Sequence, residues 1–132
     1  MTLLSDISSV HWQPALHSEL RPAGSPLRGQ GVDVVEAEAD VGQCIRTILN
    51  TPKGSDPHRP DFGSDLHLYI DHPVNEVRPH LVREAVEAIR RWEPRCELLK
   101  VIVSVDEAHV TLRVQWQLAD GVLRETEVRP WR

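Results

Sequence analysis

The residues best suited to acid–base chemistry form one short stretch, Trp92-Glu93-Pro94-Arg95. A carboxylic acid beside an apolar ring can keep its proton near neutral pH, and glycoside hydrolysis pairs such an acid with a second carboxylate about 5–9 Å away. The sequence offers two candidates for that second group, Asp61 and Asp65. However, the chain is extended around Pro94, so Glu93 and Arg95 project to the same side, and a nearby cation opposes protonation of a carboxylate. The spacing therefore favours an ion pair over a general acid.

Metal binding and nucleophilic catalysis find little support in the other residues. Zinc sites use fixed local spacings such as His-x-x-x-His, whereas the central histidines are nine and five residues apart, across prolines. These histidines and the acids among them are His58, His67, His72, Asp56, Asp61, Asp65 and Asp71. No Gly-x-Ser-x-Gly or Cys-x-x-Cys motif occurs, and TPKGSDP lacks the first glycine of a phosphate-binding loop. We therefore expect no enzyme, no metal, no cofactor and no small-molecule substrate.

The composition indicates one globular domain without a nucleic-acid or membrane function. The chain has 132 residues and a net charge of −5, which argues against nucleic acid as the main partner. No apolar run approaches the ~20 residues that span a bilayer, and the N-terminus does not have the pattern of a signal peptide. Cys44 and Cys96 are far apart in the sequence, which favours two free thiols in a reducing compartment. We therefore expect a protein that is made in the cytoplasm.

Two parts are expected along the chain: an extended, partly disordered N-terminal arm over residues 1–30 and a domain over residues 31–132. Prolines and glycines interrupt any periodicity in the arm, where the apolar ring of Trp12 either binds elsewhere or packs on its own domain. Residues 31–40 predict a short strand, and Asp40 can cap a helix that follows. That helix would bury Val41, Cys44, Ile45 and Ile48.

The centre of the chain predicts a long loop followed by the clearest helix. Residues 51–73 contain four prolines and two glycines, which is typical of a functional loop, and residues 64–70 within it form either a helical turn or an extended piece. Residues 75–92 predict a helix with Pro79 in its first turn and with Pro94 ending it. Its apolar face would hold Val82, Ala85, Val86 and Ile89, with Leu81 at the side.

The remainder predicts three strands. Val101, Val103 and Val105 alternate with polar or outward positions, and a strict alternation follows from Val110 to Leu118. The last strand, residues 122–129, is polar and lies at the end of the sequence, so we expect it at a sheet edge. The predicted fold is α+β, with elements in the order β-α-α-β-β-β and two helices covering one face of a small, mainly antiparallel sheet.

Three motifs in this order resemble those of the phage baseplate assembly protein W family, the wedge or sheath-initiator proteins of contractile tails, to which a type VI secretion baseplate subunit is related. The motifs are Thr-Pro-x-Gly (Thr51, Pro52, Gly54), Arg-Pro-x-Phe-Gly (Arg59, Pro60, Phe62, Gly63) and Glu-Pro-Arg (Glu93, Pro94, Arg95). The resemblance extends over residues 31–128 and leaves out the arm. It implies a structural component of the tail baseplate, located in the virion and assembled in the host cytoplasm.

The family resemblance also implies partners and surfaces. Six copies would surround the tail, the Glu-Pro-Arg corner would contact wedge proteins, and a fold that interlocks as sheath subunits do would template the first sheath ring by strand exchange. The expected partners are wedge proteins, the tail sheath protein and, as further candidates, tube or hub proteins. The expected protein-binding residues are Trp92, Glu93, Pro94, Arg95, Arg59, Phe62, Arg124, Glu125 and Glu127, the last three guarding the edge strand. Arg95→Ala should then leave the isolated domain folded but block assembly. A peptidoglycan hydrolase remains the alternative.

Overall fold

The computed structural model describes residues 9–16, 34–107 and 109–130. The chain divides into two compact units, residues 1–43 and residues 44–132. The boundary falls inside helix α1 (Ala37–Asn50), so the two halves of this helix belong to different units. The separation at residue 30, which the sequence suggested on grounds of order and disorder, stays a prediction.

The first unit contains a short two-stranded sheet. Strand β1 (Trp12–Pro14) pairs antiparallel with β2 (Val34–Glu36), with Trp12 opposite Glu36 and Pro14 opposite Val34. Strand β1 lies within the predicted arm, and the expectation of an extended, partly disordered arm over residues 1–30 stays a prediction. The rest of the arm, residues 1–8 and 17–30, lies outside the described residues.

The start of α1 also differs from the prediction. The helix begins at Ala37, so Asp40 lies buried in its first turn instead of capping it. Two alanines and a glutamate precede Asp40, and these residue types have high helix propensity, which extends the helix backwards into the predicted strand. The strand is accordingly shortened to β2.

The second unit contains a three-stranded antiparallel sheet in the order β3 (Glu97–Asp106), β4 (His109–Gln117), β5 (Leu123–Val128). The alternation in β4 is confirmed, because it buries Val110, Leu112, Val114 and Trp116. A bulge between Leu98 and Lys100 shifts the register of β3, a feature that the sequence did not reveal. Among the described strands β5 pairs with β4 alone, which confirms its place at an edge.

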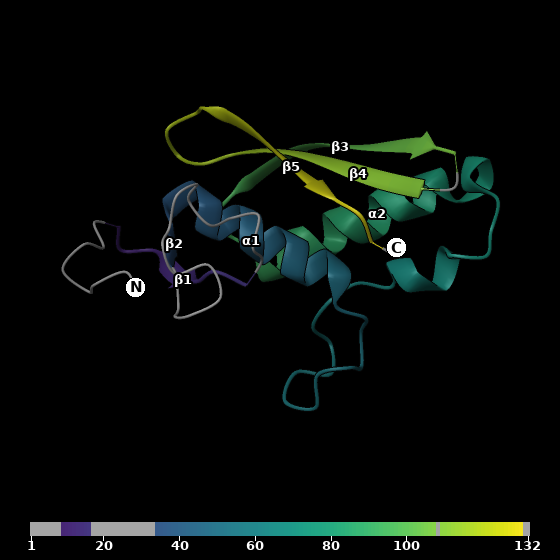
Figure 1. Ribbon diagram of the computed structural model, residues 1–132, viewed down its shortest axis with the longest axis horizontal. Helices are drawn as coiled ribbons and strands as arrows, with labels where there is room; N and C mark the ends of the chain where they lie inside the picture. Colours follow the sequence, from purple (N-terminus) through teal and green to yellow (C-terminus); the bar gives the residue numbers. More distant parts are fainter. Residues whose placement is uncertain (1–8, 17–33, 108, 131–132) are drawn as a thin grey trace, which may run out of the picture. The chain divides into compact units, whose positions relative to one another are not determined.

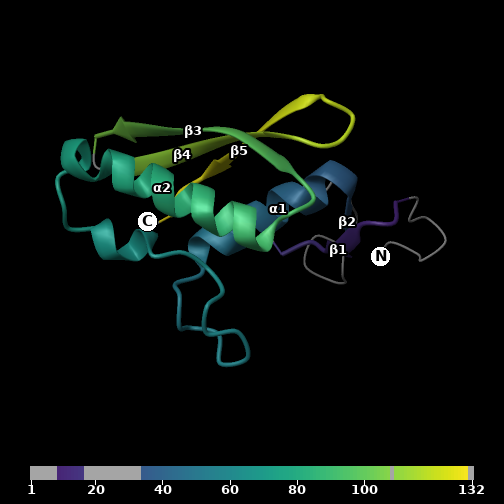
Figure 2. The same cartoon turned by 180° about the vertical axis from the view of Figure 1, so that it is seen from behind.

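Helix α2 (Val74–Trp92) and the second half of α1 cover one face of this sheet (Figures 1 and 2). The buried face of α2 contains Leu81, Ala85 and Ile89 at four-residue intervals. Val82 and Val86, which were predicted to face the core, are only half-buried, so the buried face of the helix is rotated by part of a turn from the predicted face. The core also includes residues from α1, η3 and the sheet: Ile45, Ile48, Leu49, Leu66, Val101 and Val103.

The observed ends of α2 agree with the predicted ends only in part. The helix stops at Trp92, directly before the Glu93-Pro94 pair, as predicted. It begins at Val74, so Pro79 lies in its second turn and not in its first. Before it, the stretch 64–70 contains a 3₁₀ turn, η3 (Leu66–Tyr69), which confirms the helical alternative for that segment.

The α+β class is confirmed, with two helices and a three-stranded antiparallel sheet. The element order gains one strand, β1, and the first two strands form a sheet of their own. No helix in the described ranges is long and apolar enough to cross a membrane.

Candidate protein-interaction site

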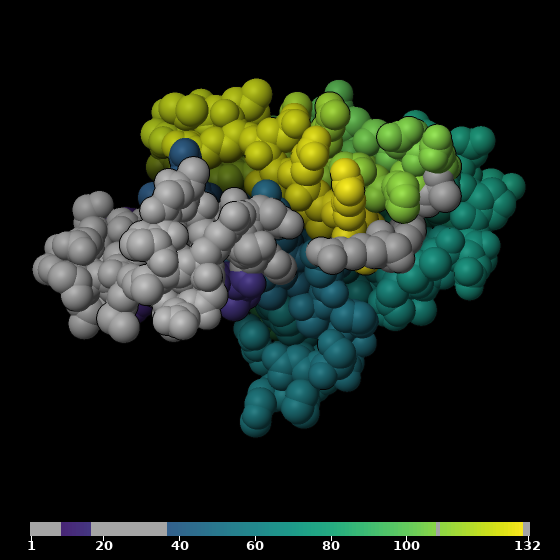
Figure 3. Space-filling model, in the orientation of Figure 1, coloured from purple at the N-terminus to yellow at the C-terminus, as the bar shows by residue number. Residues whose placement is uncertain are grey.

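The loop between α1 and η3 is closed at its base by main-chain hydrogen bonds. Ser64 N–H donates to the Thr51 carbonyl at 2.9 Å, and Gly54 N–H donates to the Pro60 carbonyl at 2.9 Å. Gly63 has φ +107°, and a Cβ there would overlap the Thr51 carbonyl, so only glycine fits this close approach. These contacts unite the Thr-Pro-x-Gly and Arg-Pro-x-Phe-Gly motifs in one structure, and the loop stands clear of the neighbouring surface (Figure 3).

Side chains fasten the base of the loop to both helices. Thr51 Oγ1 donates to the Thr47 carbonyl at 2.6 Å, and Ser64 Oγ donates to the Leu49 carbonyl at 2.9 Å, both at the end of α1. Lys53 Nζ lies 3.2 Å from a carboxylate oxygen of Asp65 and 3.8 Å from one of Glu84 on α2. The loop is therefore a positioned element, as its length and proline content indicated.

A stack of two arginines and two aromatic rings joins the loop to the end of α2. The Arg59 guanidinium lies 4.2 Å from the centre of the Phe62 ring, and the Phe62 and Trp92 rings meet edge to face at 5.2 Å. The Arg91 guanidinium lies 5.0 Å from the centre of the Trp92 ring and pairs with Asp61 at 3.2 Å. Both guanidiniums are more than half exposed. The predicted binding residues Arg59, Phe62 and Trp92 thus belong to one surface cluster, in which Phe62 itself is only 9% exposed and lies under the Arg59 guanidinium.

Sequence reasoning missed Arg91 and Asp61 as members of this surface. Arg91 was not singled out, and Asp61 was considered only as a candidate catalytic acid and as one of the acids among the loop histidines. The available signal was the position of Arg91 directly before Trp92, because arginine stacks readily on indole rings.

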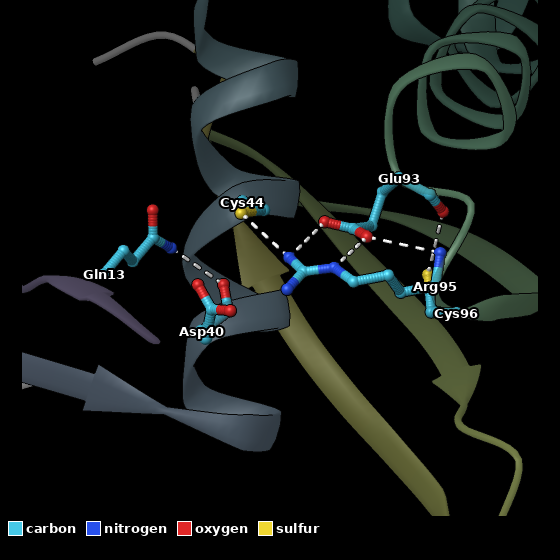
Figure 4. A network of polar contacts seen from close by, with 6 residues as sticks. All are labelled: Gln13, Asp40, Cys44, Glu93, Arg95 and Cys96. Atoms are coloured by element: carbon cyan, nitrogen blue, oxygen red, sulfur yellow. Dashed lines mark hydrogen bonds and ion pairs between the residues drawn. The ribbon is translucent and has the colours of Figure 1, made fainter. Parts of the chain in front are cut away.

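The Glu-Pro-Arg corner is held together by a forked ion pair (Figure 4). Arg95 Nε donates to Glu93 Oε1 at 2.7 Å, and Arg95 Nη2 donates to Glu93 Oε2 at 2.8 Å. Arg95 Nη2 also lies 3.3 Å from Cys44 Sγ on α1. Glu93 and Arg95 therefore share one side of the chain, as the extended backbone at Pro94 predicted.

The burial of this pair corrects part of the sequence interpretation. The Glu93 side chain is only 4% exposed and that of Arg95 is 29% exposed. The Glu93 carboxylate is thus turned into its own chain and does not face outward toward a neighbour. The exposed part of the corner consists of Pro94 and a portion of the Arg95 side chain.

The same geometry bears on hydrolysis and metal binding. Both oxygens of Glu93 accept hydrogen bonds from Arg95, while Asp61 pairs with Arg91 and Asp65 with Lys53. Each proposed catalytic carboxylate is therefore engaged in an ion pair within its own chain. Within the part of the chain that the structure describes, no group of three His, Cys, Asp or Glu side chains could hold a metal ion.

Cys96 lies beside the corner, and its thiol donates to the Glu93 carbonyl at 3.6 Å. Burial, with a smaller contribution from the Glu93 charge, raises the pKa of the Cys96 thiol to about 11. Neither Cys44 nor Cys96 forms a disulfide in the structure. The raised pKa makes Cys96 a structural thiol and not a nucleophile.

The three predicted edge residues lie on β5, apart from the corner motif in the sequence, and each has a partner within the chain. Arg124 forms a fork with Asp120, with the shorter contact at 2.8 Å, and this hydrogen bonding lowers the pKa of Asp120 to about 2. Glu125 accepts from Gln115 Nε2 at 3.1 Å, and Glu127 pairs with Arg113 at 3.2 Å. Glu125 and Glu127 lie on the exposed face of the sheet, opposite the core.

Arg46 on α1 reaches the same strand and was not anticipated. Its Nε donates to the Glu127 carbonyl at 3.3 Å, so this main-chain carbonyl of β5 already has a hydrogen-bond donor within the chain. The two residues are 81 positions apart in the sequence, and no local pattern predicts such a contact. A cationic side chain near an unpaired strand is a common protection against unwanted pairing.

These features describe a small α+β protein with surfaces suited to binding other proteins. Residues 35–121 match the family described as baseplate wedge protein gp25, and the chain belongs to that family. Family membership confirms the resemblance inferred from the three motifs and places the chain among the structural proteins of tail baseplates, which are part of the virion tail.

Individual relatives agree with this assignment. Baseplate protein W of Escherichia phage P2 is 37% identical over 75 residues, which cover 56% of this chain and 64% of that protein. The chain therefore spans less than two thirds of the length of that relative.

Solved structures show the same fold. A Geobacter sulfurreducens protein, described provisionally as a tail lysozyme, has a TM-score of 0.63 and 28% identity over 74% of this chain and 95% of its own. A chain of the post-contraction pyocin R2 baseplate has a TM-score of 0.58 and 30% identity, covering 68% of this chain and 93% of that one. A chain of the anti-feeding prophage baseplate has a TM-score of 0.55 and 21% identity, covering 90% and 82%, and shows the fold alone.

Proposed function

We propose that this protein is a non-enzymatic part of a contractile-tail baseplate that joins the wedge to the tail core and starts the sheath. In this proposal six copies surround the tail, each bound to wedge proteins through the end of α2 and to a sheath subunit through the edge strand β5. The observation that carries the proposal is the arginine–aromatic stack at the end of α2, in a chain that belongs to the baseplate wedge family.

The wedge-binding surface is proposed to be the stack of Arg59, Phe62, Trp92 and Arg91 with the adjoining Pro94. Arginine and tryptophan are the residues that most often dominate binding energy at protein interfaces. Each guanidinium lies over a ring, so its conformation is restricted before a partner arrives, which reduces the entropy lost on binding. The buried Glu93–Arg95 fork supports this surface from beneath by fixing the direction of the chain after Trp92.

The sheath-binding surface is proposed to be the unpaired side of β5. An extended segment of a neighbour can add to such an edge through main-chain hydrogen bonds. The incoming strand would replace Arg46 on the Glu127 carbonyl, so Arg46 protects the edge until the sheath subunit arrives. The outer face of β5 carries Glu125 and Glu127, whose side chains are bonded to β4 and not to the backbone edge of β5.

Charge reversal tests the wedge surface. Arg59→Glu and Arg91→Glu each replace a stacked cation by an anion, and loss of one interface hot spot weakens binding by roughly 30-fold or more. We expect at least a tenfold loss of complete baseplates, counted in electron micrographs of a complemented deletion strain. Arg78→Glu is the matched control, because Arg78 is an exposed arginine on the same helix outside the stack. Normal tails from both stack variants would refute this part of the proposal.

A proline tests the edge. Glu125→Pro is chosen because Glu125 and Glu127 occupy alternate positions of β5, and the Glu127 carbonyl is turned toward Arg46. A proline there removes an N–H that an incoming strand would use. We expect baseplates that contain the variant but carry no sheath. Thr126→Pro is the control for general damage, since Thr126 is buried beneath Trp116 and its variant should fail to fold. Sheathed tails built with Glu125→Pro would contradict strand addition.

Cell-wall hydrolysis is the second candidate, favoured only by the description of the Geobacter relative as a tail lysozyme. The ion pairs at Glu93, Asp61 and Asp65 argue against it. The purified protein should not clear a suspension of peptidoglycan, whatever its concentration. Clearing by the wild type that Glu93→Gln abolishes would establish the hydrolase instead.

A further inference from the structure

The outer face of the edge strand β5 presents one apolar side chain followed by two acidic ones. Leu123, Glu125 and Glu127 occupy alternate positions, so their side chains lie on the same face of the sheet. All three residues are exposed, Leu123 to 58%. Thr126 and Val128 point to the opposite face, where they are buried. A strand that adds to β5 would therefore meet a defined row of side chains on the outer face.

The two carboxylates of this row retain capacity for a second cation. In the described part of the chain, Glu125 is bonded through Oε2 to Gln115 Nε2 at 3.1 Å, and Glu127 through Oε1 to Arg113 Nε at 3.2 Å. Both partners belong to β4, so they approach each glutamate from the paired side of β5. A carboxylate has about four acceptor positions. The second oxygen of each group can therefore accept from a side chain on the unpaired side.

Two arginines of the chain already converge on Glu127. Arg113 pairs with its carboxylate, and Arg46 donates to its main-chain carbonyl at 3.3 Å. In the proposed strand addition the incoming segment replaces Arg46, which takes one cation away from this acidic stretch. A basic side chain on the incoming strand would restore that charge balance, because residues directly opposite each other in a sheet have Cβ atoms only about 4.5–5.5 Å apart.

The row is asymmetric, and this gives it a register. Leu123 precedes the acidic pair, and the exposed cation Arg129 follows the last residue of the strand, Val128. Two basic residues at alternate positions match the row only when they lie opposite Glu125 and Glu127. A shift by two residues places one cation opposite Leu123 or beside Arg129, and a shift by one residue turns both cations to the other face.

We propose that β5 selects an incoming strand whose outer-face residues are apolar, basic and basic, opposite Leu123, Glu125 and Glu127 respectively. The inference rests on the proposed function for the identity of this strand as part of a sheath subunit, and it adds the side-chain chemistry that recognises the strand. Main-chain hydrogen bonds hold any extended segment, whereas the acidic pair decides which segment fits and in which register.

Charge reversal tests the acidic pair in assembled tails. Full-length Glu125→Lys/Glu127→Lys is supplied to a strain that lacks the wild-type gene, and sheathed tails are counted in electron micrographs. We expect about tenfold fewer sheathed tails or less on complete baseplates, because like charges opposite one another destabilise strand pairing. Glu97→Lys/Glu107→Lys is the matched control, because it changes the net charge equally at exposed glutamates outside β5 and should leave sheathing unchanged.

A glutamine variant separates charge from folding. Glu125→Gln/Glu127→Gln keeps the size and the hydrogen-bonding capacity of both side chains, so it decides the outcome in case the lysine variant is unfolded by circular dichroism. We expect about threefold fewer sheathed tails from it. Normal sheathing by the glutamine variant, or by a folded lysine variant, overturns the inference. The proposed function stays intact in that case as long as Glu125→Pro still blocks the sheath.

Photo-crosslinking reads the pattern of the incoming strand directly. A benzophenone amino acid replaces Leu123, which keeps this position apolar and both glutamates in place, and the crosslinked residue in irradiated tails is identified by mass spectrometry. The second and the fourth residue from that point, counted in one direction along a sheath peptide, should be Lys or Arg. A crosslinked sheath peptide without these two residues overturns the inference alone. A crosslink to a protein other than the sheath, or no crosslink, refutes sheath binding at β5 and the inference with it.

Discussion

Truncation of Arg95 is expected to destabilise the fold before it affects any partner. The Glu93 carboxylate is 4% exposed and receives both of its short hydrogen bonds from the Arg95 guanidinium. After Arg95→Ala only the Arg95 N–H remains within reach, at 3.4 Å, so a buried charge loses its partner. Breaking a fully buried ion pair costs about 3–5 kcal/mol. Because Arg95 is itself 29% exposed, water can replace part of its effect, and we expect a loss of about 3 kcal/mol, at the lower end of that range.

The assay is urea unfolding followed by far-UV circular dichroism. With a denaturant dependence of about 1.5 kcal/mol/M, the loss corresponds to a decrease of about 2 M in the unfolding midpoint. The informative variant is the double mutant Glu93→Gln/Arg95→Ala, which has no buried charge. It should be more stable than Arg95→Ala alone by about 1–2 kcal/mol, although it carries one more substitution.

Two results would refute this reasoning. A change below about 0.5 kcal/mol for Arg95→Ala would mean that the pair behaves as an exposed salt bridge. A double mutant less stable than the single mutant would mean that charge burial is not the cause. The double mutant also separates stability from docking, since an assembly defect that persists after stability is restored points to the surface of the corner.

Three further predictions concern single residues. Gly63→Ala should destabilise the fold by more than about 3 kcal/mol in the same urea assay, whereas Gly54→Ala, with φ +86° but open space around it, should lose only about 1–2 kcal/mol; equal effects would contradict the steric argument. Cys96 should react with iodoacetamide at pH 8 about 100-fold more slowly in the native protein than in urea, because its pKa is raised from 9.0 to about 11. The stability that this pKa shift contributes is present below pH 9 and is lost as the pH rises through 11. The Asp120 carboxyl should titrate near pH 2 by NMR and at a higher pH in Arg124→Ala, still below 3.8 because the Val122 N–H continues to donate to it, so the pair contributes stability above pH 3.8 that is lost as the pH falls through 2; an unchanged midpoint would exclude Arg124 as the main cause.

Periodicity predicted those elements whose burial follows a simple repeat. Val110 to Trp116 alternate between core and solvent without a break, so β4 was predicted correctly from residue types alone. Helix α2 was also found, and Ala85 and Ile89 of its predicted face are buried. Val82 and Val86 are only half-buried, while Leu81, which was placed at the side, is fully buried, and only packing against the sheet decides between these positions.

The candidate site was predicted by motif and not by geometry. The motifs supplied Arg59 and Phe62, Trp92 directly precedes the Glu-Pro-Arg motif, and the structure brings the three side chains together. Burial of Glu93 and the contact of Arg46 with Glu127 depend on groups that are distant in sequence, so no local pattern could supply them. The same limit applies to the side chain of Gln43, which accepts from Leu16 N–H and donates to the Pro14 carbonyl across 27 and 29 positions of the sequence.

Because main-chain hydrogen bonds between Thr51 and Ser64 seal the base of the central loop, the length of its tip is uncoupled from the core. Each doubling of a flexible loop adds only about 0.6 kcal/mol of closure entropy. Related proteins are therefore free to diverge in length at residues 55–58 while keeping the sheet and helices unchanged.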